Sequence, residues 1–260
     1  MPLPNTERSL SADLEALGVT KGSMLMVHSS LKAVGWTVGG PEALVRSLLA
    51  VLGPDGTLVM PAETPQIMDP EDLDDPRVLP EWHETIREHL PLFDPATTPT
   101  ALGAVPETFR RWPGTERSDH PLVSVCANGR LARNITAEHS IPFAEGPGTP
   151  FEKLYELDGM TLLLGVGFNR CTSLHYAESL TPNRRTMTHR FPMLVDGVRT
   201  WIENPDMGHD NGTHFPKVGE RFMTTGAVVS GGVGEARALL FSTRALVDFA
   251  KGYFETELPG

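Results

Sequence analysis

The stretch from residue 23 to residue 61 constrains the fold of this chain more than any other. A short apolar run, SMLMVH (23–28), precedes a loop of small residues (29–40), a helical segment from Pro41 to Gly53, and a second apolar run, TLVMP (57–61). A strand, a crossover helix and a second strand within about forty residues pair the two strands in parallel. The sequence therefore predicts an α/β fold with a mainly parallel or mixed central sheet flanked by helices.

The rest of the chain continues this pattern. Further helices are expected at 6–19 (ending at Gly18), 80–90, 101–112, 150–157, 172–180 and 234–254, with strands at 121–127 and 160–167 and a β-hairpin within 186–204. No repeat or linker interrupts them, so we expect one domain over 1–260. Residues 62–99 are too long for a plain connection and are interpreted as a substrate-side insertion.

Charge and hydropathy exclude several classes of function. The 260 residues carry 22 Lys and Arg against 33 Asp and Glu, a net charge of −11, which argues against nucleic-acid and anionic-membrane partners. No apolar stretch approaches the ~20 residues of a membrane span, and the N-terminus lacks the pattern of a signal peptide. We therefore expect a cytoplasmic protein.

Acidic residues cluster after the second strand. The segment 62–76 has no Lys or Arg and contains Glu63, Asp69, Glu71, Asp72, Asp74 and Asp75. Such a cluster is typical either of a solvated loop or of a rim that binds a cation, and composition alone leaves both open.

Two loops offer groups that bind phosphate. In HSSLKAVGWTVGG (28–40), Ser29, Ser30 and Lys32 supply donors and the glycines permit a close backbone approach. This is neither a Walker A loop nor a dinucleotide fingerprint, and from the loop alone an ordinary strand–helix turn is the favoured interpretation. Arg117, in ERSDHPLVSV (116–125), either pairs with a phosphate or with a surface carboxylate.

The stretch TSLHYAES (172–179) places His175 and Glu178 three residues apart on a predicted helix, hence on one side of it. They are interpreted either as a catalytic base with its neighbour or as a solvated polar face. A zinc site with His209, Asp210 and His214 lacks metal-type spacing, so no metal is expected. Cys171 is either a nucleophile or, like Cys126, a packing residue.

Taken together, these stretches resemble the antibiotic N-acetyltransferase family, specifically the aminoglycoside 3-N-acetyltransferases. The matching pieces are MLMVHSSLKAVGW, the R-S-x-H-P-x-x-S run at 117–124, LLLGVGFNRCTSLHYAE and WIENPD, in the family's order over most of 15–215. The resemblance implies that family's own α/β architecture, distinct from GNAT acetyltransferases. It also implies acetyl transfer from acetyl-CoA to the 3-amino group of the 2-deoxystreptamine ring of aminoglycosides, which confers resistance.

The resemblance also implies roles for individual residues. Coenzyme contacts would come from His28, Ser29, Ser30, Leu31, Lys32, Val34, Gly35, Arg117, Ser118, His120, Ser124 and Val125. The cationic substrate would be held by Glu63, Asp69, Glu81, Asp206 and Asp210. Some members carry a histidine shortly before the ELDG segment, whereas 144–150 contains none, so its role is not carried over.

Acetyl transfer to an amine needs a base, since most alkylammonium groups are protonated at neutral pH. We expect His175 to be that base in a direct attack within a ternary complex, with Glu178 or Glu203 orienting the ring. Three alternatives stay open: an acetyltransferase for another amine metabolite, a ping-pong enzyme using Cys171, and an acidic module that sequesters cationic drugs. A monomer and a homodimer are both compatible with the sequence.

Overall fold

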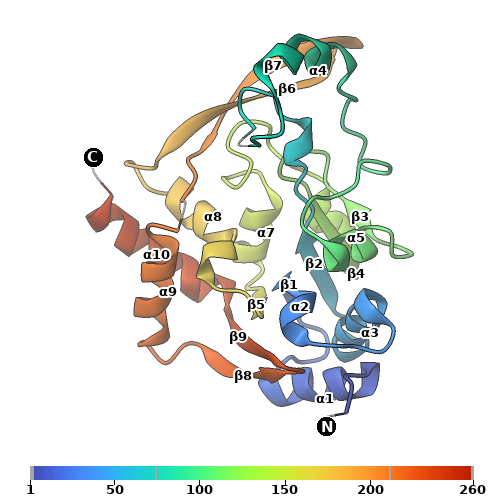
Figure 1. Ribbon diagram of the computed structural model, residues 1–260. Helices are drawn as coiled ribbons and strands as arrows, with labels where there is room; N and C mark the ends of the chain where they lie inside the picture. The colour runs from blue at the N-terminus through green and yellow to red at the C-terminus, as the bar shows by residue number, and fades with distance from the viewer. Residues whose placement is uncertain (1–2, 74, 211, 259–260) are drawn as a thin grey trace.

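The computed structural model describes residues 3–73, 75–210 and 212–258, and its centre is a mixed seven-stranded sheet (Figure 1). The strands, in spatial order, are β3 (Glu116–Arg117), β4 (Val125–Gly129), β2 (Thr57–Pro61), β1 (Met24–Ser29), β5 (Met160–Leu164), β9 (Ala236–Ser242) and β8 (Val229–Val233). The three central strands β2, β1 and β5 are parallel, and the outer strands join them antiparallel. The predicted α/β fold with a mixed central sheet is confirmed.

Helices cover both faces of this sheet. One face carries α1 (Glu7–Leu17), α3 (Gly40–Leu52) and α5 (Ala104–Arg110), and the other carries α6 (Ala132–Thr136), α7 (Pro150–Glu156), α8 (Ser173–Ser179) and α10 (Thr243–Glu257). Strand β1 serves both layers because successive side chains alternate across a strand. Leu25 and Val27 pack with the first group of helices, and Met24 and Met26 with the second.

Local sequence signals account for the ends of the first helices. In α1, the Thr6 hydroxyl accepts a hydrogen bond from the Ser9 backbone, and Gly18 ends the helix in the left-handed region at φ 107°. Pro41 lies in the first turn of α3, and Gly53 follows its last residue. The predicted loop at 29–40 contains one short helix, α2 (Leu31–Val34).

The insertion and the hairpin lie together at one end of the molecule, at the top of Figure 1. The insertion contains η1 (Pro65–Ile67), η2 (Pro80–Trp82) and α4 (His83–His89), and the hairpin consists of β6 (Thr186–Val195) and β7 (Val198–Met207). Arg190 of β6 binds Asp72 and Glu71 of the insertion, with Nη2 2.8 Å and 3.0 Å from their carboxylates. These ion pairs fasten the two segments to each other.

The C-terminal segment corrects one sequence prediction. The sequence predicts one long helix over 234–254, but 236–242 form β9, which pairs antiparallel with β5. Its apolar residues Ala238, Leu239, Leu240 and Phe241 are buried, so pairing with β5 overrides helix propensity. Ser242 then caps α10 by accepting a hydrogen bond from the backbone of Ala245.

Two shorter helices complete the description: η3 (Phe168–Arg170), which follows β5, and α9 (Phe215–Met223), which packs against α10 and η3. Within the described ranges, no helix combines the length and the apolar character that crossing a membrane requires.

Candidate active site

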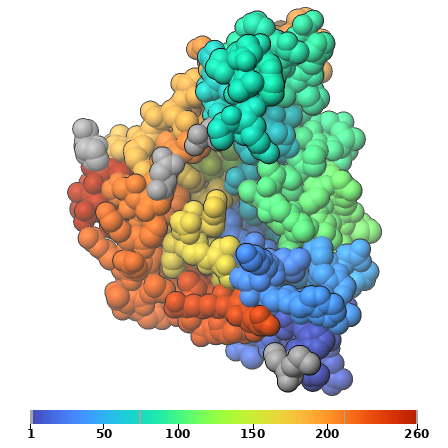
Figure 2. Space-filling model, viewed as in Figure 1, coloured from blue at the N-terminus to red at the C-terminus, as the bar shows by residue number. Residues whose placement is uncertain are grey.

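A cleft of about 840 Å³ opens at the carboxyl ends of the three parallel strands. Val27, His28 and Ser29 at the end of β1, Pro61 at the end of β2, and Val166 beyond β5 line its floor. The beginning of the insertion, the residues 101–103 that follow it and the end of β7 supply its walls. Figure 2 shows the hollow between the yellow segment near residue 170 and the teal and green segments. In α/β sheets, ligands bind at this position.

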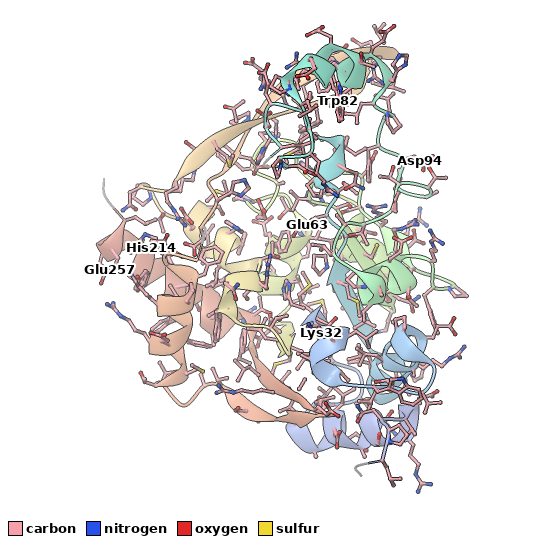
Figure 3. All side chains as sticks on the ribbon, viewed as in Figure 1. Lys32, Glu63, Trp82, Asp94, His214 and Glu257 are labelled. Carbon is pink, nitrogen blue, oxygen red and sulfur yellow. The ribbon has the colours of Figure 1, made fainter. Side chains whose placement is uncertain are left out.

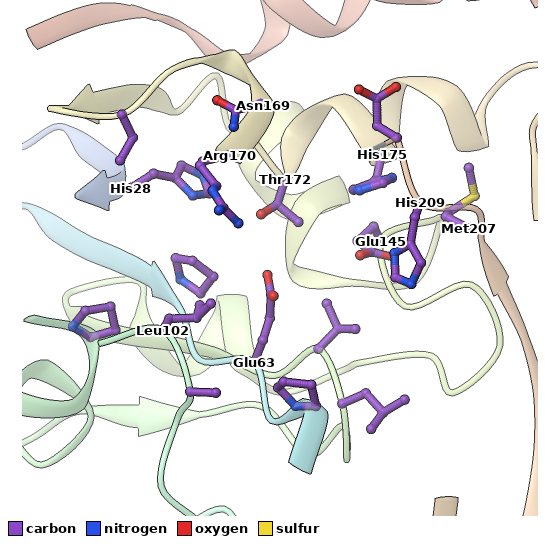
Figure 4. Close-up of a pocket in the computed structure, with 18 of the residues that line it drawn as sticks. His28, Glu63, Leu102, Glu145, Asn169, Arg170, Thr172, His175, Met207 and His209 are labelled. Carbon is purple, nitrogen blue, oxygen red and sulfur yellow. The ribbon is translucent and has the colours of Figure 1, made fainter. Parts of the chain in front are cut away.

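His175 lines the cleft from α8, close to Thr172 in the preceding turn (Figure 4). Its ring packs edge-on against Phe215, with 4.6 Å between ring centroids, and its Nδ1 is buried without a partner among the described residues. Burial, reinforced by Arg185 and His209, lowers the pKa of His175 to about 4, although Asp210 opposes this effect. The ring is therefore neutral at pH 7 and can accept a proton.

No hydrogen bond joins the side chains of Glu178 and His175, although both belong to α8. Its side chain is fully buried and accepts hydrogen bonds from the backbone nitrogen, Nε and Nη2 of Arg185, at 2.7–2.9 Å. The same guanidinium lies 3.2 Å from Asp210, which accepts bonds from the first backbone nitrogens of α9. Glu178 and Asp210 therefore hold α8, α9 and Arg185 together, and Asp210 also borders the cleft.

Three carboxyl groups face the cleft from different segments: Glu63 after β2, Glu145 in the loop before α7, and Asp206 on β7. Figure 3 labels Glu63 near the centre of the molecule, below the insertion. Burial raises the pKa of Glu63, while Arg170 opposes the rise. Burial also raises the pKa of Asp206 to about 6 and that of Glu145 well above its ordinary value, the latter with help from Asp206 and Glu63. Ionisation of these buried carboxyl groups costs free energy in the free protein, and a bound cation would reduce that cost.

The other acidic residues of the prediction lie elsewhere. Asp69 is buried and bonded to Arg87; burial raises its pKa, but the bonds from Arg87 and the Glu71 backbone bring it below the ordinary value. Glu81 on η2 and Glu203 on β7 are exposed, and neither lines the cleft. Asp74 lies outside the described residues.

The predicted coenzyme residues of 28–35 divide into two groups. His28 and Ser29 line the cleft, and His28 Nε2 and Ser29 Oγ are buried without partners in the described ranges. Burial lowers the pKa of His28 to about 4. The remaining residues shape α2 beside it: the Ser30 hydroxyl caps the helix, Leu31 is half-buried, Lys32 is exposed, Val34 is buried, and Gly35 ends the helix at φ 89°.

The predicted residues of 117–125 form a scaffold behind the cleft. Arg117 donates to Ser124 Oγ and to the carbonyls of Pro95, Thr98 and Ala62, so its guanidinium is occupied by protein groups. His120 is buried; its Nδ1 accepts from the backbone nitrogens of Leu122 and Val123, and its Nε2 donates to Ile141.

Ser118 connects this scaffold to the acidic side of the cleft. The nitrogen of Val125, which is buried, donates to Ser118 Oγ, and that hydroxyl donates over 2.8 Å to His139 Nδ1. His139 Nε2 in turn donates over 2.8 Å to the carbonyl of Ala144, next to Glu145. Although 144–150 contains no histidine, His139 just upstream therefore contacts this segment.

Both cysteines are buried in the core. Burial raises the pKa of the Cys126 and Cys171 thiols to about 12, so neither is a thiolate at neutral pH. In the described part of the chain, no group of three or more His, Cys, Asp or Glu is arranged to hold a metal ion.

Three titratable residues that line the cleft, Glu145, Arg170 and His189, were not predicted from the sequence, and His209, which was considered only for a metal site, also lines it. Arg170 and Glu63 extend into the cleft from opposite walls (Figure 4). Arg170 lies between the buried strand and His175, so its position along the chain was a usable signal. Glu145, His189 and His209 belong to loop and hairpin segments whose approach to the cleft depends on long-range packing.

The fold and this cleft define an α/β protein of the antibiotic N-acetyltransferase type. The model of the family described as aminoglycoside 3-N-acetyltransferase matches residues 26–255, and the chain belongs to this family of acetyltransferases. A curated relative, the SPbeta prophage-derived aminoglycoside N(3')-acetyltransferase-like protein YokD of Bacillus subtilis (strain 168), is 36% identical over 96% of this chain and 93% of its own.

Solved structures agree with this assignment. The crystal structure of YokD from Bacillus subtilis is 36% identical and has a TM-score of 0.94, with 99% of this chain and 96% of that chain covered. The binary complex of AAC-IIIb with CoASH has a TM-score of 0.87 at 31% identity, covering 99% of this chain and 100% of its own. AAC-VIa bound to sisomicin has a TM-score of 0.87 at 29% identity, with the same coverage.

Proposed function

We propose that this protein transfers the acetyl group of acetyl-CoA to the 3-amino group of the 2-deoxystreptamine ring of aminoglycosides, with His175 as general base. The observation that carries the proposal is that a neutral imidazole borders the same cleft as the carboxyl groups of Glu63, Glu145 and Asp206. A base and a cation-binding surface are the two features that acetylation of a charged amine needs.

The imidazole would act after the amine has been brought to the thioester. The ammonium group first loses a proton to water, and the free amine then attacks the acetyl carbon. The nitrogen becomes positively charged in the tetrahedral intermediate, so its remaining protons are acidic enough for the neutral ring of His175 to take one as the thiolate of coenzyme A leaves. His175 lies at the edge of an apolar layer that includes Phe215, which keeps bulk water from its buried side. No carboxylate among the described residues orients the ring, so it would act without the third member of a triad.

The acidic side of the cleft supports a polycationic acceptor. Of the described lining residues, Arg170 is the only Lys or Arg, whereas Glu63, Glu145, Asp206 and Asp210 are acids. We infer that the acceptor contacts these acids and that 62–99, whose first residues include Glu63, belongs to the acceptor side. The structure of AAC-VIa bound to sisomicin supports the same class of acceptor.

The opposite end of the cleft suits the coenzyme. Ser29 Oγ and His28 Nε2 are polar atoms without partners in the described ranges, at the end of a buried strand. We infer that the pantetheine arm passes them on its way to His175, with α2 and its exposed Lys32 at the mouth. The AAC-IIIb structure with CoASH supports coenzyme A as the carrier. A ping-pong route through Cys171 is disfavoured because that thiol is buried and protonated.

A thiol-release assay tests the proposal. The purified protein is mixed with acetyl-CoA and, separately, with kanamycin, gentamicin, sisomicin, a simple polyamine or buffer. We expect rapid coenzyme A release with one or more of the 2-deoxystreptamine drugs and acetylation of the 3-amino group by mass spectrometry and NMR. Acetylation of the polyamine alone would assign the protein to a different amine acceptor, and binding without release would make it a sequestering module.

A further inference from the structure

Glu145 and Asp206 line the same wall of the cleft, and the backbone nitrogen of Ala144, the residue next to Glu145, donates a hydrogen bond to Asp206 Oδ1. Asp206 is 2% exposed and Glu145 9%. Asp206 Oδ1 accepts hydrogen bonds from the backbone nitrogens of Ala144 and Met207, at 2.9 Å and 2.8 Å. These bonds fix the aspartate and tie the loop that carries Glu145 to β7.

The second carboxyl oxygen of Asp206, Oδ2, lacks a hydrogen-bond partner among the described residues. Asp206 Oδ2 is buried, and no group in the described ranges donates to it unless the Glu145 carboxyl carries a proton. Two ionised carboxylates that are buried next to each other only accept hydrogen bonds and repel each other. A single proton between them removes the repulsion and satisfies the buried oxygen.

Few neighbouring groups offset the negative charge that Glu145 and Asp206 would carry if both were ionised. Among the described residues, the titratable and charged groups facing it or packed beside it are Glu63, His139, Arg170, His175, Arg184, His189, His209 and Asp210. Glu63 adds further negative charge, and Arg170 acts mainly on Glu63. Arg184 lies over the ring of Phe143, 4.8 Å from its centroid.

We propose that Glu145 and Asp206 share one proton in the free protein and release it when an ammonium group of the acceptor binds beside them. In this step the carboxyl O–H bond breaks, the proton passes to water, and both carboxylates accept N–H donors of the ligand. The pair is thus a proton-coupled anchor for one positive charge of the acceptor. The inference deepens the proposed function and rests on its polycationic acceptor.

Infrared spectroscopy of the free protein tests the shared proton directly. At neutral pH in heavy water, the wild-type protein is expected to show the carbonyl stretch of a protonated carboxyl group. Glu145→Gln has no carboxyl there, and in Asp206→Asn the negative charge that helps to hold the proton on Glu145 is gone. Glu145→Gln should lose this band and Asp206→Asn should weaken it, whereas Glu220→Gln, which changes an exposed carboxylate on α9, should keep it, and Glu63→Gln identifies any contribution of Glu63.

Calorimetry with kanamycin tests the release. Titrations in two buffers with different ionisation enthalpies give the number of protons exchanged on binding, and the ligand's own contribution cancels between variants. The wild-type protein should release about one proton more than Glu145→Gln at pH 7. Glu145→Gln should also bind kanamycin roughly 10–100-fold more weakly, because a charged hydrogen bond is lost. Addition of kanamycin should remove the infrared band from the wild-type protein.

The inference is overturned if the free wild-type protein shows no band, if Glu145→Gln has the same band as the wild type, or if the band persists unchanged at saturating kanamycin. The thiol-release assay on the same samples shows independently whether the proposed enzymatic function holds. Acetylation with a persistent band refutes the anchor alone, whereas the expected band changes without acetylation refute the enzyme alone. Absence of any kanamycin binding refutes both the release step and the drug as acceptor.

Discussion

Glu178 and Arg185 form an ion pair whose acidic member is completely buried, with Arg185 Nη2 2.7 Å from Glu178 Oε2. Arg185 extends the pair to Asp210, so a single guanidinium joins the end of α8 to the start of α9. The sequence predicted Glu178 as a partner for His175, but both carboxylate oxygens of Glu178 accept hydrogen bonds from Arg185. His175 thus owes its position to helix α8 and to Phe215 rather than to a neighbouring acid.

Replacement of Glu178 by glutamine should therefore affect stability more than chemistry. The change leaves Arg185 without its main countercharge, and we expect the free energy of unfolding to fall by roughly 2–4 kcal/mol. Urea unfolding measures this loss, with Glu220→Gln as the control that stays within about 0.5 kcal/mol of the wild type. A Glu178→Gln protein of normal stability but without activity would instead give Glu178 a chemical role.

Replacement of His175 by alanine should affect chemistry more than stability. General-base assistance is worth roughly 10²–10⁴-fold, and we expect kcat to fall by that factor while KM for acetyl-CoA changes little. Steady-state kinetics together with a thermal unfolding curve provide the measurement. A variant that keeps more than about a tenth of the wild-type kcat would remove His175 from the mechanism.

The buried thiols should neither react with thiol reagents nor take part in catalysis in the folded protein. Because burial raises the pKa of Cys171 to about 12, a thiol reagent at neutral pH should label neither cysteine until urea exposes them. Cys171→Ala should retain its kcat, although the small cavity lowers stability by about 1 kcal/mol. Trapping of an acetylated Cys171 in the native enzyme would establish the ping-pong route instead.

The shared carboxyl pair also predicts a pH dependence of stability. The pKa of Glu145 is raised in the folded protein, so the folded state holds this proton more tightly than the unfolded chain does. Its contribution to stability is complete below the unfolded pKa of about 4.3 and is lost as the pH rises through the folded value. Glutamine does not ionise, so it avoids this loss.

The Tm of Glu145→Gln relative to the wild type should therefore increase as the pH rises from about 5 into the alkaline range. A difference of about 1 kcal/mol corresponds to a shift of roughly 2–4 °C in a protein of this size. Differential scanning calorimetry across that range provides the check. A constant Tm difference would mean that Glu145 ionises as readily in the folded protein as in the unfolded chain.

Local patterns predicted much of the fold. The β1–α3–β2 crossover, the helix ends at Gly18 and Gly53, and the strand before His175 depend on neighbours in sequence, and the structure contains them. Strand β9 has a helical pattern in its sequence, and its burial depends on pairing with β5, more than seventy residues earlier in the chain. Pairing with a distant strand competes here with local helix propensity, and the periodicity of the segment itself cannot reveal it.

The candidate site was predictable to the extent that its residues follow strands. His28, Ser29, Glu63 and His175 lie at or shortly after the ends of β1, β2 and β5, and all four line the cleft. Glu145 was not predicted because its place depends on the bond between the Ala144 nitrogen and Asp206, sixty-two residues away. Arg117, Ser118 and His120 matched the family pattern, but their partners in this protein include backbone groups and His139.

The ion pairs between Arg190 and the acids of the insertion couple sequence changes in the insertion to the position of the hairpin. Segments 62–99 and 186–207 are separate along the chain, yet Glu71, Asp72 and Arg190 lock them into one body above the strands. A change of length or charge in either segment is therefore transmitted to the other, while the ends of β1 and β5 stay where the core holds them. If these segments hold the acceptor as proposed, variants that accept new amines should arise by paired changes in them, with the proposed coenzyme end inherited intact.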